Sequence, residues 1–79
     1  MKNVTKAQLD KGCKASREMI SAWTKDRRMV KGLTQRELAD ICGIDRKTVN
    51  RIENGHFSPT IDTLTRIALS LNAKLPVLV

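Results

Sequence analysis

The chain of 79 residues is long enough for one small domain, and its 41% hydrophobic and 29% charged residues are typical of a globular protein. Fifteen Lys and Arg residues against eight Asp and Glu residues give a net charge of +7. Such a charge favours nucleic acid, an acidic protein or an anionic membrane surface as a partner, and disfavours a basic one. The only aromatic residues are Trp23 and Phe57, too few for a base-stacking platform that binds single strands.

Positive charge is concentrated in the first third of the chain. Residues 1–31 hold nine basic and three acidic side chains, and residues 1–15 are interpreted as a basic N-terminal extension. Apolar residues recur at helical spacing through this stretch, but Gly12 interrupts the pattern. Either a short first helix ends at Gly12, or one long helix tolerates the glycine at a cost of about 1 kcal/mol. We favour the break, with Ser16 capping a second helix that stops at Gly32.

Two short helices are predicted in the middle of the chain. Thr34 fits the N-cap of a capping box with Glu37, and Gly43 ends that helix after about two turns. Asp45 fits the N-cap of the next helix, which spans about residues 46–53. Two such helices joined by a turn with a glycine hinge form a helix-turn-helix.

The rest of the chain contains one more helix and a mostly apolar tail. Thr60 is the expected N-cap of the last helix, and Asn72 is expected to close it in the left-handed conformation. Residues 74–79 are rich in β-branched and apolar side chains around Pro76, a pattern that permits an edge strand. The predicted fold is therefore all-α, with five to six helices, a main domain over residues 16–73 and a short C-terminal strand.

The second helix of the central pair has two chemically different sides. With successive residues about 100° apart, Val49 and Ile52 fall on one side. The other side is polar and comprises Arg46, Lys47, Asn50 and Arg51. Arginine and lysine bind the O6 and N7 acceptors of guanine in the major groove, and asparagine pairs with adenine. We therefore predict that these four polar side chains contact DNA bases.

The central segment resembles the lambda-repressor/Cro-like helix-turn-helix family, also called the XRE family. The resemblance covers residues 32–72 and is carried by Leu33-Thr34-Gln35-Arg36-Glu37-Leu38-Ala39, Ile52-Glu53-Asn54-Gly55 and Pro59-Thr60-Ile61. It implies that the second helix lies in the major groove. It also implies phosphate contacts from Gln35 and from the backbone near Asn54 and Gly55. Thr34 is expected to be a cap first, and it is counted among the phosphate contacts as well. Many members carry aliphatic residues where this chain has Thr24 and Arg27, so we expect Trp23 to serve in the core.

The tail carries a second resemblance. The run Leu-Asn-Ala-Lys-Leu-Pro-Val-Leu-Val after a helix is similar to the end of HipB-type antitoxins, whose C-terminal strands pair across a two-fold axis. A lone apolar edge strand is a pairing template that dimerisation would cover. Since Pro76 has no N–H, its edge of the strand is expected to be the free one. The residues expected to bond the partner strand are Leu75, Val77 and Val79.

The expected function is sequence-specific regulation of transcription, most simply repression. The chain would bind a palindromic operator in double-stranded DNA as a homodimer, with half-sites about 34 Å, or a multiple of that, apart. One version is the antitoxin of a type II toxin–antitoxin pair, with a toxin protein as partner. Another is a phage-type or restriction-controller regulator without a toxin. The basic first third is either a DNA-wrapping arm or extra helix, or simply a solvated surface.

The alternative hypothesis, from a different class of function, is a protein-binding adaptor that has lost DNA binding. An enzyme is not expected, because no catalytic cluster is evident; Asp40, Asp45, Asp62 and Glu53 are interpreted as caps and helix-face charges. Cys13 and Cys42 lack Cys-x-x-Cys spacing, and one histidine cannot complete a zinc site with them. No metal or cofactor is therefore expected. Without a membrane-spanning run or a signal sequence, the protein is expected to be cytoplasmic and nucleoid-associated.

Overall fold

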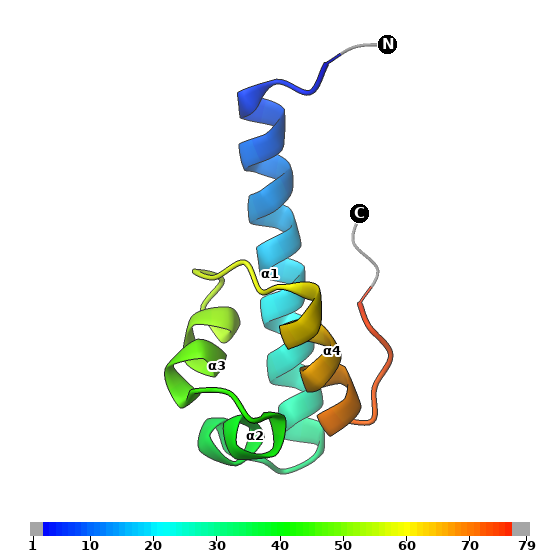
Figure 1. Ribbon diagram of the computed structural model, residues 1–79. Helices are drawn as coiled ribbons and strands as arrows, with labels where there is room; N and C mark the ends of the chain where they lie inside the picture. The colour runs from blue at the N-terminus through cyan, green and yellow to red at the C-terminus, as the bar shows by residue number, and fades with distance from the viewer. Residues whose placement is uncertain (1–2, 77–79) are drawn as a thin grey trace.

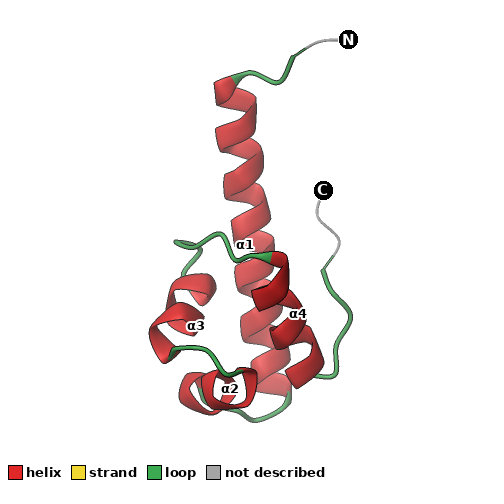
Figure 2. Cartoon of the chain, in the orientation of Figure 1, coloured by secondary structure: helices red, strands yellow, loops and turns green. Residues whose placement is uncertain are grey.

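The computed structural model describes residues 3–76 and contains four α-helices in that range, with no strand. Their bounds are α1 (Lys6–Val30), α2 (Gln35–Cys42), α3 (Arg46–Glu53) and α4 (Ile61–Ser70). Helices α2, α3 and α4 gather around the C-terminal half of α1, and the N-terminal half of α1 projects beyond them (Figure 1). Figure 2 shows the same all-helical architecture, which confirms the predicted all-α class.

Helix α1 is one continuous helix of 25 residues, so the predicted break at Gly12 and the predicted cap at Ser16 are wrong. The helix starts instead at a capping box: the Thr5 hydroxyl accepts from the Gln8 N–H (3.1 Å), and the Gln8 side chain accepts from the Thr5 N–H (2.9 Å). A break at Gly12 would have left the carbonyl groups before it and the N–H groups after it without helical partners, and the continuous helix keeps these hydrogen bonds. A glycine inside the ladder costs only about 1 kcal/mol. Two expected helices therefore merge, which reduces the count from five or six to four.

Three of the helices end next to the glycine or asparagine residues that the sequence predicts as their ends. Gly32 has φ 68°, and beyond it the Leu33 N–H donates to the Arg28 carbonyl (3.1 Å), as in a Schellman motif. Gly43 repeats this arrangement after α2 with φ 71°. Asn72 closes α4 with φ 48°, as predicted. Left-handed backbone at these positions ends each helix where the sequence indicated.

The predicted N-caps of the three short helices are confirmed. The Thr34 hydroxyl accepts from the Glu37 N–H (3.1 Å), and the Glu37 carboxylate accepts from the Thr34 N–H (2.9 Å). Asp45 caps α3 through the Lys47 N–H, and Thr60 caps α4. The hydrogen bonds from Thr34 hold the pKa of the Glu37 carboxyl below its ordinary value.

Replacing Glu37 by glutamine should remove the acid sensitivity of this capping box. Because the folded pKa of Glu37 is lowered, its contribution is complete above the ordinary carboxyl pKa and is lost as pH falls through the folded pKa. Glutamine retains the acceptor for the Thr34 N–H, as Gln8 does for Thr5. Urea unfolding of both proteins at about pH 7 and about pH 3 should show a stability difference that disappears in acid. A pH-independent difference would contradict this assignment.

The core lies where α2, α3 and α4 meet the C-terminal half of α1. Its buried residues are Ile20, Leu38, Ala39, Cys42, Val49, Ile52, Leu64, Ile67 and Leu71. Trp23 and Phe57 pack against this cluster as partly buried residues, so the core role expected of Trp23 is confirmed in part. Thr24 stands at one of the positions where family members carry aliphatic residues, and it is fully buried. Arg27, at the other such position, is exposed and paired with Asp26 (3.0 Å).

Thr24 is an unfavourable core residue, because its buried hydroxyl has no hydrogen-bond partner within the described structure. An unsatisfied buried hydroxyl costs about 1–3 kcal/mol. Thr24→Val, which replaces the hydroxyl by a methyl group of similar shape, should therefore raise the free energy of unfolding by about 1 kcal/mol or more. Thr65→Val, at an exposed position of α4, should change it by about 0.5 kcal/mol or less. Urea denaturation measures both, and equal effects would contradict the assignment.

The predicted C-terminal strand is not formed in the part of it that the structure describes. Residues 74–76 follow α4 as an irregular segment, with Leu75 46% exposed. Val77 and Val79 lie outside the described residues. A strand is defined by hydrogen bonds to a neighbouring strand, and residues 3–76 of one chain offer no such neighbour.

Candidate nucleic-acid interface

Helices α2 and α3 form the predicted helix-turn-helix. The turn between them begins at Gly43, where the Ile44 N–H donates to the Ala39 carbonyl (3.0 Å). Ala39 is 2% exposed, and its small side chain lets α3 pack closely. Leu38, Val49 and Ile52 are each at most 1% exposed. This packing holds the apolar side of α3 against the domain, so the opposite side of the helix must face outward.

The opposite side of α3 is exposed and cationic, as the helical spacing predicted. Arg46, Lys47 and Arg51 are all exposed. Within residues 3–76 the two ion pairs are Arg27–Asp26 and Arg28–Glu53, so none of the three α3 cations is neutralised by a carboxylate there. Three unpaired cations on one rigid helix can bind an anionic polymer and donate to acceptors on base edges.

Asn50 differs from these three cations because it is partly buried and already hydrogen-bonded. Its amide nitrogen donates to Gln35 Oε1 (3.2 Å), and its amide oxygen accepts from Asn54 Nδ2 (3.0 Å). An amide has two N–H groups and two lone pairs, so one of each remains for a base. The predicted base contact of Asn50 is chemically compatible with this arrangement and remains a prediction.

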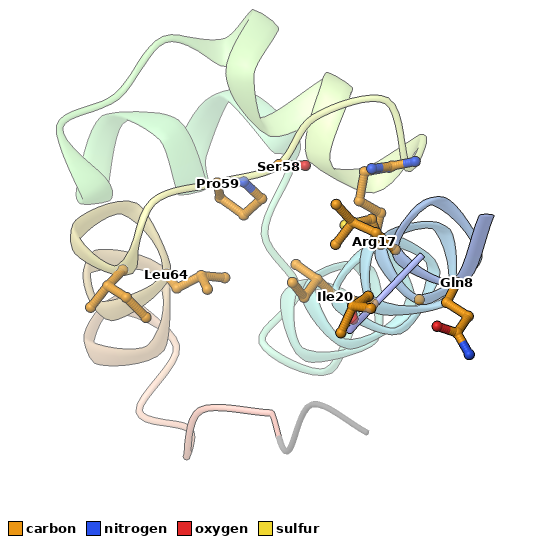
Figure 3. A pocket seen from close by; sticks show the side chains of 12 residues that line it. Gln8, Arg17, Ile20, Ser58, Pro59 and Leu64 are labelled. Carbon is orange, nitrogen blue, oxygen red and sulfur yellow. The ribbon is translucent and has the colours of Figure 1, made fainter. Parts of the chain in front are cut away.

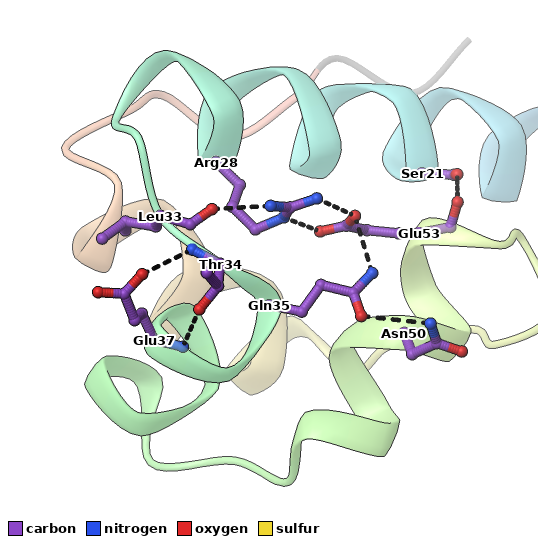
Figure 4. A network of polar contacts seen from close by, with 8 residues as sticks. All are labelled: Ser21, Arg28, Leu33, Thr34, Gln35, Glu37, Asn50 and Glu53. Atoms are coloured by element: carbon purple, nitrogen blue, oxygen red, sulfur yellow. Dashed lines mark hydrogen bonds and ion pairs between the residues drawn. The ribbon is translucent and has the colours of Figure 1, made fainter.

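Gln35 belongs to a polar network that links α1, α2 and α3 (Figure 4). Its amide nitrogen donates to Glu53 Oε1 (3.2 Å). Arg28 binds the same carboxylate twice, from Nε to Oε2 (2.7 Å) and from Nη2 to Oε1 (2.9 Å). Arg28 also donates to the Leu33 carbonyl (2.7 Å), and the Ser21 hydroxyl donates to the Glu53 carbonyl. The network therefore fixes the start of α2 relative to the end of α3.

The Arg28–Glu53 pair is buried. The Arg28 side chain is 13% exposed and that of Glu53 is 3% exposed. The hydrogen bond to Glu53 raises the pKa of Arg28 further above its ordinary value, so the guanidinium stays charged. Two charges out of water are stable only when each satisfies the other, and the bidentate geometry provides this.

The expectation that Glu53 is a cap or helix-face charge is therefore wrong. Glu53 follows Ile52 and lies four residues after Val49, and helical spacing places it on the buried side of α3. The spacing therefore indicates that Glu53 is buried, but it does not identify Arg28 as the partner of its carboxylate. Arg28, whose importance was missed, lies four residues after the buried Thr24 on α1.

The predicted phosphate-contacting residues lie at two ends of the helix pair. Thr34 caps α2 and Gln35 is its first residue. Asn54 follows α3 as an exposed residue, and Gly55 has φ 72°, which a glycine adopts without strain. The free N–H groups at the start of α2 favour anions. The placement suits phosphates on either side of a groove, and these four contacts remain predictions.

A metal site, a reactive thiol and a membrane-spanning helix are the other functional features to consider in residues 3–76. No three His, Cys, Asp or Glu side chains in that part of the chain are grouped to hold a metal ion. Burial raises the pKa of the Cys42 thiol, so it remains protonated within the core. No helix among residues 3–76 is long and apolar enough to cross a membrane.

The helix pair with its exposed α3 thus defines a helix-turn-helix domain. The chain belongs to the HTH_3 helix-turn-helix family, whose model matches residues 25–78. This is a family of DNA-binding transcriptional regulators and not of enzymes. The match covers α2 and α3 completely, and it begins within the C-terminal half of α1.

Individual relatives agree with this assignment. The chain is 42% identical over 59 residues to the "ImmF control region 10 kDa protein" of Bacillus phage phi105, covering 75% of this chain and 66% of that protein. It is 40% identical over 47 residues to an "uncharacterized HTH-type transcriptional regulator" of Methanothermobacter thermautotrophicus, covering 60% and 68%. The crystal structure of an HTH_3 family transcriptional regulator from Vibrio cholerae superimposes with a TM-score of 0.76 at 32% identity, covering 80% of this chain and 35% of that chain.

Proposed function

We propose that this chain is a sequence-specific regulator of transcription that binds a palindromic operator as a homodimer. The observation that carries the proposal is the exposed cationic side of α3, formed by Arg46, Lys47 and Arg51 and held outward by the burial of Val49 and Ile52. A helix of this width fits the major groove of B-DNA, where arginine and lysine can donate to guanine. Repression, most simply by occupying a promoter, is the proposed outcome.

The two ends of the helix pair give the proposed complex its register. Gln35 at the start of α2 and the Asn54–Gly55 backbone after α3 would contact phosphates on the two sides of the groove. Such contacts position the protein without reading sequence. The base contacts of Arg46, Lys47, Asn50 and Arg51 would then supply the specificity.

A homodimer is proposed because one eight-residue α3 reaches only a few base pairs, and two copies double the number of bases that are read. The residues proposed to join the copies are Leu75, Val77 and Val79. Leu75 supports this, because it is an apolar side chain left 46% exposed in the single chain. Half-sites would then lie about 34 Å apart, one turn of B-DNA, or a multiple of that distance.

Among the versions of this regulator, the phage-type version is the one that the comparisons favour. The relative from Bacillus phage phi105 carries a name that refers to a control region. No observation favours the antitoxin version. We therefore propose a regulator of a phage-type control region.

A selection of bound sequences from random duplex DNA tests this function. We expect an enriched palindrome, two chains per duplex in sedimentation, and an affinity that falls steeply with salt, with a slope near −0.9 per phosphate neutralised. Thr65→Ala, at an exposed position of α4, serves as a control that should leave binding unchanged. If no preferred sequence is recovered, or if the affinity does not change with salt, the result would favour the protein-binding adaptor that has lost DNA binding.

A further inference from the structure

We propose that the projecting N-terminal half of α1 is a second phosphate-binding surface. Lys14 and Arg17 are its centre, and Lys6 lies beyond them; together they extend the footprint on duplex DNA past the helix-turn-helix. The inference rests on the proposed function. The family model begins at residue 25, so it does not account for this half of α1.

The direction in which these side chains lie follows from the contacts of α1. Ser21 donates to the Glu53 carbonyl and Arg28 binds the Glu53 carboxylate, so the side of α1 that carries Ser21 and Arg28 faces α3. At 3.6 residues per turn, Arg17 lies about 40° and Lys14 about 20° from Ser21 around the helix. Both cations are therefore on the side of α1 that faces α3, but one and two turns beyond the contact.

Figure 3 shows this placement for Arg17, whose guanidinium extends toward the segment between α3 and α4 that carries Ser58. Arg17 and Ser58 line the same groove, which separates α1 from the start of α4. The exposed Asn54, a proposed phosphate contact, lies at the beginning of that segment. A phosphate chain that passes Asn54 would thus next approach Arg17.

The proposed phosphate contacts already run parallel to α1. Gln35 bonds the Glu53 carboxylate at the level of Arg28, and Asn54 directly follows Glu53 at the level of Ser21. From Ser21 along the helix axis, Lys14 lies about 10 Å further and Lys6 about 22 Å further. The line from Gln35 past Asn54 is therefore continued by the cations of α1.

The charges of this half of α1 are free to bind a polyanion. Residues 3–12 are all exposed, as is Lys14, and Arg17 is partly buried. The two ion pairs in residues 3–76 do not involve Lys6, Lys14 or Arg17. Asp10 and Glu18 are the only carboxylates from residue 6 to residue 18, against the basic side chains Lys6, Lys11, Lys14 and Arg17. Four basic side chains against two acidic ones leave this half of α1 with a net positive charge, with Asp10 about 20° from Ser21 on the same side as Lys14 and Arg17 and Glu18 about 60° from Ser21.

Two double variants with equal loss of charge test the proposal. Lys14→Gln with Arg17→Gln removes two cations from the side that faces α3. Lys11→Gln with Arg27→Gln removes two cations that lie about 80° and 120° from Ser21 around the helix. Glutamine is a good helix former, so both variants should keep the helical circular dichroism of the wild type.

We expect the Lys14/Arg17 variant to lose about 1.8 from the slope of log affinity against log salt, about 0.9 for each phosphate contact. Between 50 and 200 mM salt the affinity of the wild type for its selected duplex would then fall about 12-fold more than that of the variant. Ethylation interference should show phosphates that matter to the wild type and not to this variant. The Lys11/Arg27 variant should match the wild type in slope and in phosphates.

Two outcomes would overturn the inference. A Lys14/Arg17 variant with the slope of the wild type would show that this side of α1 is only a solvated surface, and an equal loss of slope in both double variants would show that only the net charge matters. In either outcome the proposed function stands, because the wild type still binds its operator. A wild type that binds no duplex overturns both proposals together. The two failures are therefore distinguished by the wild-type measurement alone.

Discussion

Arg28→Met should be the most destabilising single substitution on the polar side of this fold, with a loss of about 3–5 kcal/mol in the free energy of unfolding. The substitution removes both guanidinium bonds from the Glu53 carboxylate, which is 3% exposed, and leaves a buried charge without a counter-ion. Domains of this size are stable by roughly 4–12 kcal/mol, so the loss is a large part of the total. Urea denaturation followed by circular dichroism measures it.

Two further variants establish the cause. Arg27→Met, next along α1, removes an exposed cation paired only with Asp26 and should cost about 0.5 kcal/mol or less. Arg28→Met combined with Glu53→Met removes both buried charges and should recover much of the stability. If Arg28→Met is no more harmful than Arg27→Met, the buried ion pair does not hold the helices together.

The second large effect is expected on DNA. Arg51→Ala should weaken operator binding by about 1–3 kcal/mol, or about 5- to 150-fold, because each bidentate arginine–guanine contact discriminates bases by that amount. The variant should lose its base preference at one operator position only, where it should bind any base pair equally well. Binding to operators substituted one base pair at a time measures this.

Two controls separate reading of bases from attraction to phosphates. Gln35→Ala, at the start of α2, should weaken all sequences by a similar factor. Lys74→Ala removes one exposed cation beyond α4 and should preserve the base preference. If Arg51→Ala leaves the preference at every position unchanged, Arg51 does not read a base.

Most of the fold could be predicted because its boundaries are local. Thr34, Asp45 and Thr60 cap helices by bonding N–H groups two or three residues away, and Gly43 and Asn72 adopt the left-handed backbone that ends them. Such signals need no tertiary information.

The two errors in the fold arose where local signals were insufficient. At Gly12 the sequence allowed both a break and a continuous helix, and the continuous helix keeps the backbone hydrogen bonds that a break would have removed. The expected strand after Lys74 depends on a neighbouring strand, which the described part of one chain does not supply.

The candidate site divides in the same way. The exposed side of α3 was predictable because helical spacing separates Arg46 and Lys47 from Val49 and Ile52. The network around Glu53 was not, because it joins residues 18 and 25 positions apart in the chain. Only packing reveals such partners.

The central claim is that the cationic side of α3 enters the major groove of a duplex. The most direct measurement compares operators in which single purines are replaced by 7-deazapurines, which lack the N7 acceptor of the major groove and keep the minor-groove edge. We expect affinity to fall at a few positions within each half-site, and at one of them to fall for the wild type but not for Arg51→Ala. Unchanged affinity at every position would contradict the claim.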